Sequence, residues 1–239
     1  MQCLILAGGL GTRIKLVSED LPKSLIPVCG KPFIDHQLEW LAGQGIKSVV
    51  LATGYQASMI SDLVGTGERW GLDVTCIEDG PELLGTAGSI RNAVDHNLME
   101  DGFFVLYGDS YLNVNFSDVW KTSDGGRLPV MTVYRNEDAL DRSNVIMKNR
   151  DLVLFEKGRK DACEIGMEHI DYGLSIFPRE IILTHVAPHL NIDLADVCHR
   201  LSLSHELRAH EVYERFYEIG SPEGLADFEA HLSSGGNHD

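Results

Sequence analysis

The sequence has little positive charge and no long apolar run. Its 20 Lys and Arg residues face 36 Asp and Glu residues, which leaves a formal net charge of −16 at pH 7. A general DNA or RNA binder presents a basic face, so we expect no nucleic-acid partner. No stretch approaches the roughly 20 apolar residues that a membrane helix needs, so we expect no membrane association.

Cysteine is also scarce, with five residues that are scattered and form no C-x-x-C pair. A secreted disulfide framework needs a different pattern, so we expect reduced thiols and a cytoplasmic location. The N-terminal apolar run Cys3–Ala7 lacks a preceding basic segment and stops at Gly8, which is not the pattern of a signal peptide.

What is present is an alternation of apolar strand-like runs and helical patterns through the first half of the chain. Hydrophobic content is 44% and charged content 23%, as in ordinary globular proteins. The predicted strands are Gln2–Ala7, Ser48–Thr53, Asp73–Ile77 and Phe103–Tyr107, and the predicted helices are Phe33–Gln44, Ala57–Val64 and Ser89–Asn97. This order predicts an α/β fold with a Rossmann-like, doubly wound, mostly parallel sheet that has helices on both faces.

After about residue 125 the pattern changes to short strands with few helices between them. The predicted strands are Val130–Tyr134, Val145–Met147, Leu152–Phe155 and Tyr172–Phe177, and the closing elements are Ile192–Leu203, Leu207–Glu211, Phe216–Ile219 and Pro222–Leu232. No linker composition separates them from the first half. We therefore expect a mixed β insertion within a single domain, residues 1–232, followed by a flexible tail, residues 233–239.

The carboxyl ends of the predicted parallel strands carry glycine beside charged residues, at the edge where open α/β sheets bind ligands. The first of these ends, Gly8–Arg13, is a phosphate-loop candidate, because glycines let backbone N–H groups approach phosphate oxygens and Arg13 adds a cation. It is neither a Walker A loop nor a dinucleotide fingerprint, which would need glycine in place of Ile14. Residues 1–34 are also basic, with four cations against two acids, on an otherwise acidic chain. An anion is therefore expected to bind there.

Several linked motifs occur in one order along the chain. They are LAGGLGTR at 6–13, LPKSLIPV at 21–28, GTAG at 85–88, YGDS at 107–110, EKG at 156–158, DYG at 171–173 and EIGSPE at 218–223. Together they resemble the sugar-1-phosphate nucleotidyltransferases, and most of all the stand-alone hexose or heptose 1-phosphate guanylyltransferases. The likeness spans nearly the whole chain.

The resemblance implies transfer of a nucleotidyl group from an NTP to a sugar 1-phosphate, giving an NDP-sugar for polysaccharide biosynthesis and pyrophosphate. It implies catalytic roles for Arg13 on the leaving phosphates, Lys23 on the α-phosphate and Asp109 on the metal. The implied nucleotide-binding residues are Leu6, Ala7, Gly8, Gly9, Gly11, Thr12, Gly85 and Thr86.

The implied cofactor is Mg²⁺, which prefers one or two carboxylates together with phosphate oxygens. Asp109 is one candidate ligand, and Glu218 is the other, at a position where the family usually has aspartate.

The sugar and its phosphate are expected to contact Asn144, Glu156, Lys157 and Asp171. Many relatives have glycine in place of Asn144 and asparagine in place of Asp171, so the resemblance does not imply that the sugar is glucose. The segment Glu78–Leu84 lacks a glutamine with which some uridylyltransferases and thymidylyltransferases of the family contact the nucleotide base. Its absence favours GTP as the nucleotide.

Several alternatives stay open at this stage. The substrate could be another NTP or another phosphorylated metabolite. A glycosyltransferase usually shows D-x-D, whereas Asp109 is followed by Ser110 and Tyr111, and a non-catalytic nucleotide-sugar-binding homologue would be expected to lose Arg13, Lys23 or Asp109. The expected partners are an NTP and a sugar 1-phosphate, and a homo-oligomer remains open.

Overall fold

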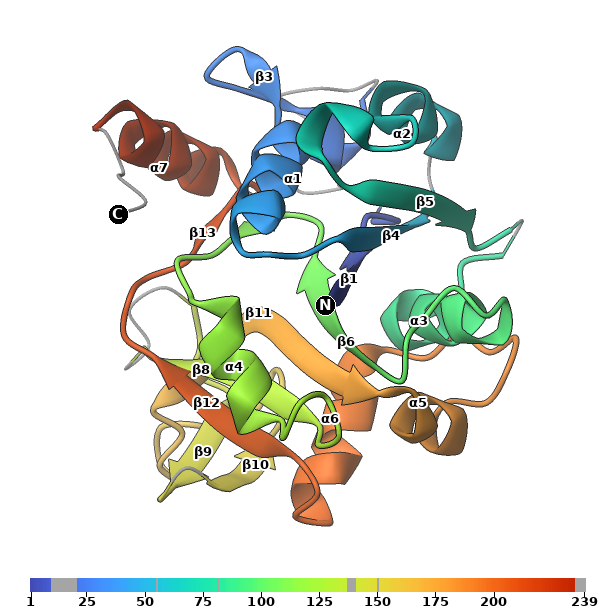
Figure 1. Ribbon diagram of the computed structural model, residues 1–239. Helices are drawn as coiled ribbons and strands as arrows, with labels where there is room; N and C mark the ends of the chain where they lie inside the picture. Colours follow the sequence, from blue (N-terminus) through green and yellow to red (C-terminus); the bar gives the residue numbers. More distant parts are fainter. Residues whose placement is uncertain (10–20, 55, 81, 137–140, 150, 235–239) are drawn as a thin grey trace.

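The computed structural model describes residues 1–9, 21–54, 56–80, 82–136, 141–149 and 151–234 (Figure 1). Its first half contains β1 (Gln2–Leu6), β2 (Pro27–Val28), β3 (Lys31–Pro32), α1 (Phe33–Gly43), β4 (Ser48–Thr53), α2 (Ala57–Val64), β5 (Asp73–Glu78), α3 (Gly85–Asp95), β6 (Gly102–Tyr107), β7 (Ser110–Tyr111) and α4 (Phe116–Thr122). Two short 3₁₀ helices, η1 (Lys23–Leu25) and η2 (Glu68–Trp70), flank α1 and α2.

The second half is richer in strands. It contains β8 (Val130–Arg135), β9 (Val145–Lys148), β10 (Asp151–Phe155), β11 (His169–Pro178), α5 (Arg179–His185), α6 (Leu194–Leu203), β12 (Arg208–Val212), β13 (Tyr217–Glu218) and α7 (Pro222–Ser233).

One large sheet organises the described residues. It has nine strands in the order β5-β4-β1-β6-β11-β8-β12-β10-β9. The strands β5, β4, β1 and β6 pair in parallel, and β8 and β12 also pair in parallel. The strands β11 and β10 run in the opposite direction to the other seven strands of this sheet. The prediction of a mostly parallel sheet with a mixed insertion is confirmed.

Helices cover both faces of this sheet, because side chains on a strand alternate between the two faces. On β1, Cys3 and Ile5 enter the core under α1, α2, α4 and α7, whereas Leu4 enters the core under α3, α5 and α6. The buried strands can therefore be apolar throughout, which is the pattern of β1, β4 and β6 in the sequence.

Several boundaries differ from the sequence prediction. The helix α3 begins at Gly85, not Ser89, so the GTAG segment forms its first turn. The helices α4 and α5 were not predicted; α4 is capped by Asn115, whose side chain accepts a hydrogen bond from the backbone of Asp118. The strand β11 begins at His169, three residues before the predicted start at Tyr172, because His169 and Asp171 also pair with β8. A register irregularity and the left-handed Gly173 (φ 99°) follow Asp171 within the strand.

The C-terminal helix α7 reaches Ser233, and residues 235–239 of the predicted tail lie outside the described residues. Within the described residues, no helix has both the length and the apolar character needed to cross a membrane.

Candidate active site

A cleft of about 460 Å³ opens at the carboxyl ends of β1, β5 and β6. Its walls include eight of the predicted residues, namely Leu6, Ala7, Gly8, Gly9, Lys23, Gly85, Thr86 and Asp109. The predicted residues Gly11, Thr12 and Arg13 lie outside the described residues. The strand ends therefore bring the N-terminal glycines, the GTAG segment and the YGDS turn to one place, as the parallel sheet predicts.

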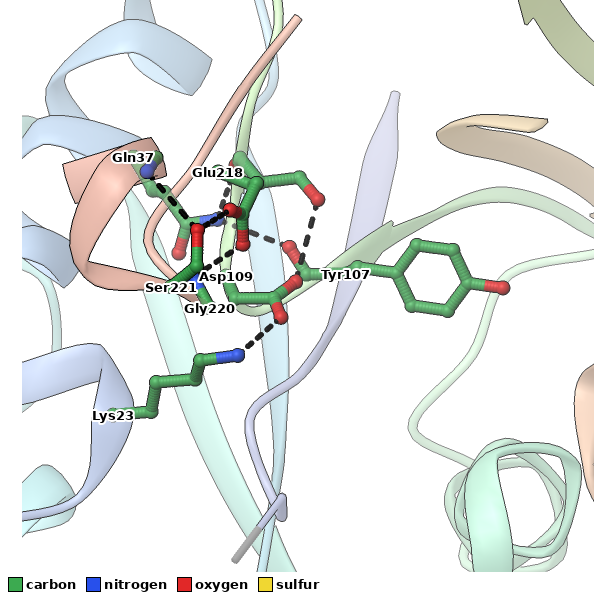
Figure 2. Close-up of polar contacts among 9 residues, drawn as sticks. Lys23, Gln37, Tyr107, Asp109, Glu218, Gly220 and Ser221 are labelled. Carbon is green, nitrogen blue, oxygen red and sulfur yellow. Dashed lines mark hydrogen bonds and ion pairs between the residues drawn. The ribbon is translucent and has the colours of Figure 1, made fainter. Parts of the chain in front are cut away.

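The side chains of Lys23 and Asp109 form an ion pair within this cleft (Figure 2). The ammonium Nζ lies 2.6 Å from Oδ2 of Asp109, and the two side chains are 15% and 31% exposed. Lys23 opens η1, whose preceding Pro22 fixes an extended entry into the turn. A cation and a carboxylate far apart in the sequence thus face each other at the cleft wall.

The turn that carries Asp109 is fixed by backbone contacts. The N–H of Gly108 donates to the carbonyl of Leu6 at 3.1 Å, and a Cβ on Gly108 would lie 2.5 Å from that same oxygen. Only glycine lets β6 pass so close to β1 at this point. The buried Gln37 of α1 adds two donated bonds, to the carbonyls of Tyr107 (3.2 Å) and Ser110 (2.8 Å).

Glu218 reaches the same place from the other end of the chain. The strand β13 pairs antiparallel with β7, which sets Glu218 opposite Ser110, and Ile219 N–H donates to the carbonyl of Asp109 at 3.0 Å. The carboxylate accepts hydrogen bonds from the N–H of Gly220 and from the hydroxyl of Ser221, the latter at 2.6 Å.

Gly220 marks the point around which the three charged groups gather. A Cβ built there would meet Oε2 of Glu218, Nζ of Lys23 at 2.8 Å and Oδ2 of Asp109 at 3.6 Å. Two carboxylates that converge in this way fit the ligand set that Mg²⁺ prefers, which is one or two carboxylates completed by water or phosphate oxygens. Within the described ranges, no group of three or more His, Cys, Asp and Glu side chains is arranged to hold a metal ion by itself.

A second pocket of about 460 Å³ lies beside the first. Its lining includes Asn144, Lys157, Asp171 and Glu218, and Tyr107 lines both pockets. Three of the four predicted sugar-site residues are therefore brought together.

The fourth predicted sugar-site residue, Glu156, does not line this pocket. Its carboxylate accepts a hydrogen bond from Arg159 at 2.7 Å, three residues further along the chain.

Asp171 is held in place on three sides. Its Oδ1 accepts from the N–H of Gly173 at 3.0 Å, its Oδ2 accepts from the hydroxyl of Tyr107 at 3.3 Å, and its own N–H donates to the side chain of Asn144 at 3.0 Å. Burial raises the pKa of the Asp171 carboxyl, and the positive charge of Lys157 opposes that rise.

The sequence reasoning missed Asp79 as a site residue, although it noted the strand end on which it lies. This half-buried carboxylate lines the first cleft, and its Oδ2 accepts from the hydroxyl of Ser89 at 2.8 Å and from the N–H of Leu84 at 3.4 Å. Burial raises the pKa of the Asp79 carboxyl. Tyr107 and Gln37 were also not predicted as site residues, although Tyr107 belongs to the YGDS motif.

The predicted nucleotide residues of GTAG make structural contacts as well. A Cβ on Gly85 would lie 2.6 Å from the carbonyl of Ile192, and Gly85 is left-handed (φ 70°), so both space and backbone require glycine. The hydroxyl of Thr86 donates to Asp193 and accepts from the N–H of Leu194, which ties α3 to the start of α6.

A doubly wound sheet whose carboxyl edge holds a glycine-rich strand end, a lysine and two converging carboxylates is typical of α/β proteins that bind phosphorylated ligands. The chain belongs to the nucleotidyl transferase family, whose model matches residues 2–232.

Two guanylyltransferases are among the proteins that this chain resembles. Over 118 residues the chain is 37% identical to a D-glycero-α-D-manno-heptose 1-phosphate guanylyltransferase of Campylobacter jejuni, covering 49% of this chain and 51% of that protein. Over 186 residues it is 32% identical to a mannose-1-phosphate guanyltransferase of Candida albicans, covering 76% of this chain and 51% of that protein. The chain thus spans about half the length of these relatives.

Solved structures resemble the whole chain. HddC from Yersinia pseudotuberculosis, complexed with GMP-PN, superposes with a TM-score of 0.76 at 27% identity, covering 97% of this chain and 99% of that one. A putative glucose-1-phosphate thymidylyltransferase from Bacillus anthracis superposes with a TM-score of 0.83 at 19% identity, covering 96% and 94%, and so shows the shared fold.

Proposed function

We propose that this protein transfers a nucleotidyl group from an NTP to a sugar 1-phosphate and releases pyrophosphate. The observation that carries the proposal is the place of the charged groups between two pockets. Lys23 and Asp109 line the first cleft, Glu218 lines the second pocket, and all three converge around Gly220. A reaction that joins two phosphorylated ligands needs its charge-screening groups at such a junction.

In this reaction an oxygen of the sugar phosphate attacks the α-phosphorus of the NTP while pyrophosphate leaves in line. Both reactants are anions, so the protein has to orient them and screen their repulsion. We assign the α-phosphate to Lys23, whose ammonium would have to leave its ion pair with Asp109, and the sugar phosphate to Lys157, which lines the second pocket. Binding of the leaving phosphates by Arg13 remains a prediction.

We propose Mg²⁺ as the cofactor, held by Asp109 and Glu218. Bound there, Mg²⁺ would neutralise phosphate charge as the α-phosphorus reacts. A cytoplasmic location is part of the same proposal; all five cysteines are free thiols, as a reducing compartment requires.

We propose GTP as the nucleotide and a hexose or heptose 1-phosphate as the acceptor. Guanine presents adjacent N–H donors, and the carboxylate of Asp79 at the wall of the first cleft is an acceptor for them. The guanylyltransferases among the relatives support the same choice. The Asp79→Asn variant is expected to lose its preference for GTP over ATP, measured as the ratio of kcat/KM values.

The experiment is pyrophosphate release by the purified protein, with each of five NTPs against the 1-phosphates of mannose, glucose and D-glycero-α-D-manno-heptose. We expect Mg²⁺-dependent release with GTP and one of these sugars, and a GDP-sugar product by mass spectrometry. Lys23→Ala serves as the control for a contaminating enzyme. Release of nucleoside diphosphate from an NDP-sugar would instead favour a glycosyltransferase, and nucleotide-sugar binding without turnover would favour a regulatory homologue.

A further inference from the structure

Tyr107 is the one residue that lines both the cleft and the second pocket among the residues that the structure describes. Its backbone belongs to the turn that carries Asp109, since Tyr107 ends β6 and its carbonyl accepts a bond from Gln37. Its side chain points the other way: in Figure 2 the phenol ring extends away from the cluster of Asp109 and Glu218.

The phenol contacts two of the charged residues that line the second pocket, Asp171 and Lys157. Its hydroxyl donates to Oδ2 of Asp171 at 3.3 Å. The ammonium of Lys157 lies 5.3 Å from the centroid of its ring, within the range of a cation–π interaction. One side chain therefore holds both an acceptor for sugar hydroxyls and a cation for the sugar phosphate.

The phenol is the donor in this contact, and Oδ2 of Asp171 is the acceptor. The second oxygen of Asp171 accepts from the N–H of Gly173. With both oxygens held by donors, the carboxylate has one orientation, and its remaining lone pairs are available to a ligand.

We propose that Tyr107 is a positioning residue for the sugar 1-phosphate, acting through Asp171 with its hydroxyl and through Lys157 with its ring. This inference rests on the proposed function and adds to it: the sugar affinity of this protein depends on a residue of the strand that carries the metal-binding turn.

The test is steady-state kinetics on Tyr107→Phe, varying GTP and the sugar 1-phosphate separately. The phenylalanine keeps the ring beneath Lys157 and removes only the bond to Asp171. A bond to a charged group has a large enough effect to raise KM for the sugar 1-phosphate about tenfold, while KM for GTP and kcat stay within about twofold. Tyr107→Leu, which also removes the ring, should raise the same KM further.

Tyr172→Phe is the matched control. Tyr172 is buried, and its hydroxyl accepts from the N–H of Asn113, but it lines neither pocket. Both phenylalanine variants lose a hydrogen-bonded hydroxyl, so thermal denaturation should show similar changes in Tm. Only the variant at Tyr107 should change KM for the sugar.

A double-mutant cycle tests the route through Asp171. If the hydroxyl acts through that carboxylate, Tyr107→Phe should add nothing further in an Asp171→Ala background. An unchanged sugar KM in Tyr107→Phe, an equal change in Tyr172→Phe, or fully additive effects in the cycle would overturn the proposal while the enzyme remains active. Wild-type protein that releases no pyrophosphate with any substrate pair would overturn the proposed function, and this inference with it.

Discussion

Replacing Gly220 by alanine tests the convergence of charged groups most directly. The new Cβ would lie 2.8 Å from Nζ of Lys23, where ordinary contacts begin at 3.4 Å, and it would overlap Oε2 of Glu218. Lys23 must therefore withdraw by about half an ångström and Glu218 by more. Since both contacts are the ends of flexible side chains, the backbone can stay in place. The variant should change the site and leave the fold.

The magnitude follows from the displacement. A misplacement of about 1 Å at a reacting centre can cost about a hundredfold in rate, so we expect kcat of Gly220→Ala to fall roughly 10- to 100-fold. The Mg²⁺ concentration for half-maximal activity should rise, because Glu218 can no longer keep its position. The change in stability should stay near about 1 kcal/mol, which corresponds to roughly 2–4 °C in Tm for a chain of this length.

The assay is pyrophosphate release at a series of Mg²⁺ concentrations, with thermal denaturation of the same samples. Gly43→Ala is the matched control, because a Cβ there has nothing within 4 Å and alanine favours the helix α1. A Gly220→Ala protein with wild-type kcat and Mg²⁺ requirement would refute the argument that Lys23, Asp109 and Glu218 act together at this point.

Three further predictions concern the proposed roles of single side chains. Asp109→Asn should fold normally but lose most turnover, and near-normal activity at saturating Mg²⁺ would contradict its role as a metal ligand. Glu218→Gln should raise the Mg²⁺ concentration needed for activity, whereas Glu218→Asp should retain activity. An unchanged Mg²⁺ titration in Glu218→Gln would show that Glu218 does not bind the metal and only forms hydrogen bonds with Gly220 and Ser221. Asp171→Ala should raise KM for the sugar 1-phosphate by roughly tenfold to a hundredfold, because it removes an acceptor for a sugar hydroxyl and leaves the Tyr107 hydroxyl unpaired. If separate kinetics for the two substrates showed a change in the nucleotide KM instead, Asp171 would belong to the base or metal site.

The sequence by itself determined the layered α/β architecture and the edge at which ligands bind. Parallel strands that are covered on both faces must be apolar throughout, and runs such as Ser48–Thr53 and Gly102–Tyr107 can be recognised by that property alone. Glycines are equally informative, because Gly108 after β6 and Gly85 at the start of α3 lie where the backbone or a neighbouring loop leaves no space for a side chain.

Local sequence was less informative where neighbouring side chains decide the outcome. Glu156 was predicted to contact the sugar, but its carboxylate binds Arg159, three residues further along the chain, and does not line the second pocket. The strand β11 begins at His169, three residues before the predicted start at Tyr172, because its first residues pair with β8.

Only the tertiary structure showed how side chains from distant segments meet. The pairing of β13 with β7 sets Glu218 beside the Asp109 turn, and the packing of η1 lets Lys23 reach the same carboxylate. Tyr107 lines both pockets because its strand β6 lies between β1 and β11. The cleft opens at the end of β1, and Asp171 of the second pocket lies near the start of β11. Strand order and register are set by burial across the whole sheet, and no local propensity or motif spacing encodes them.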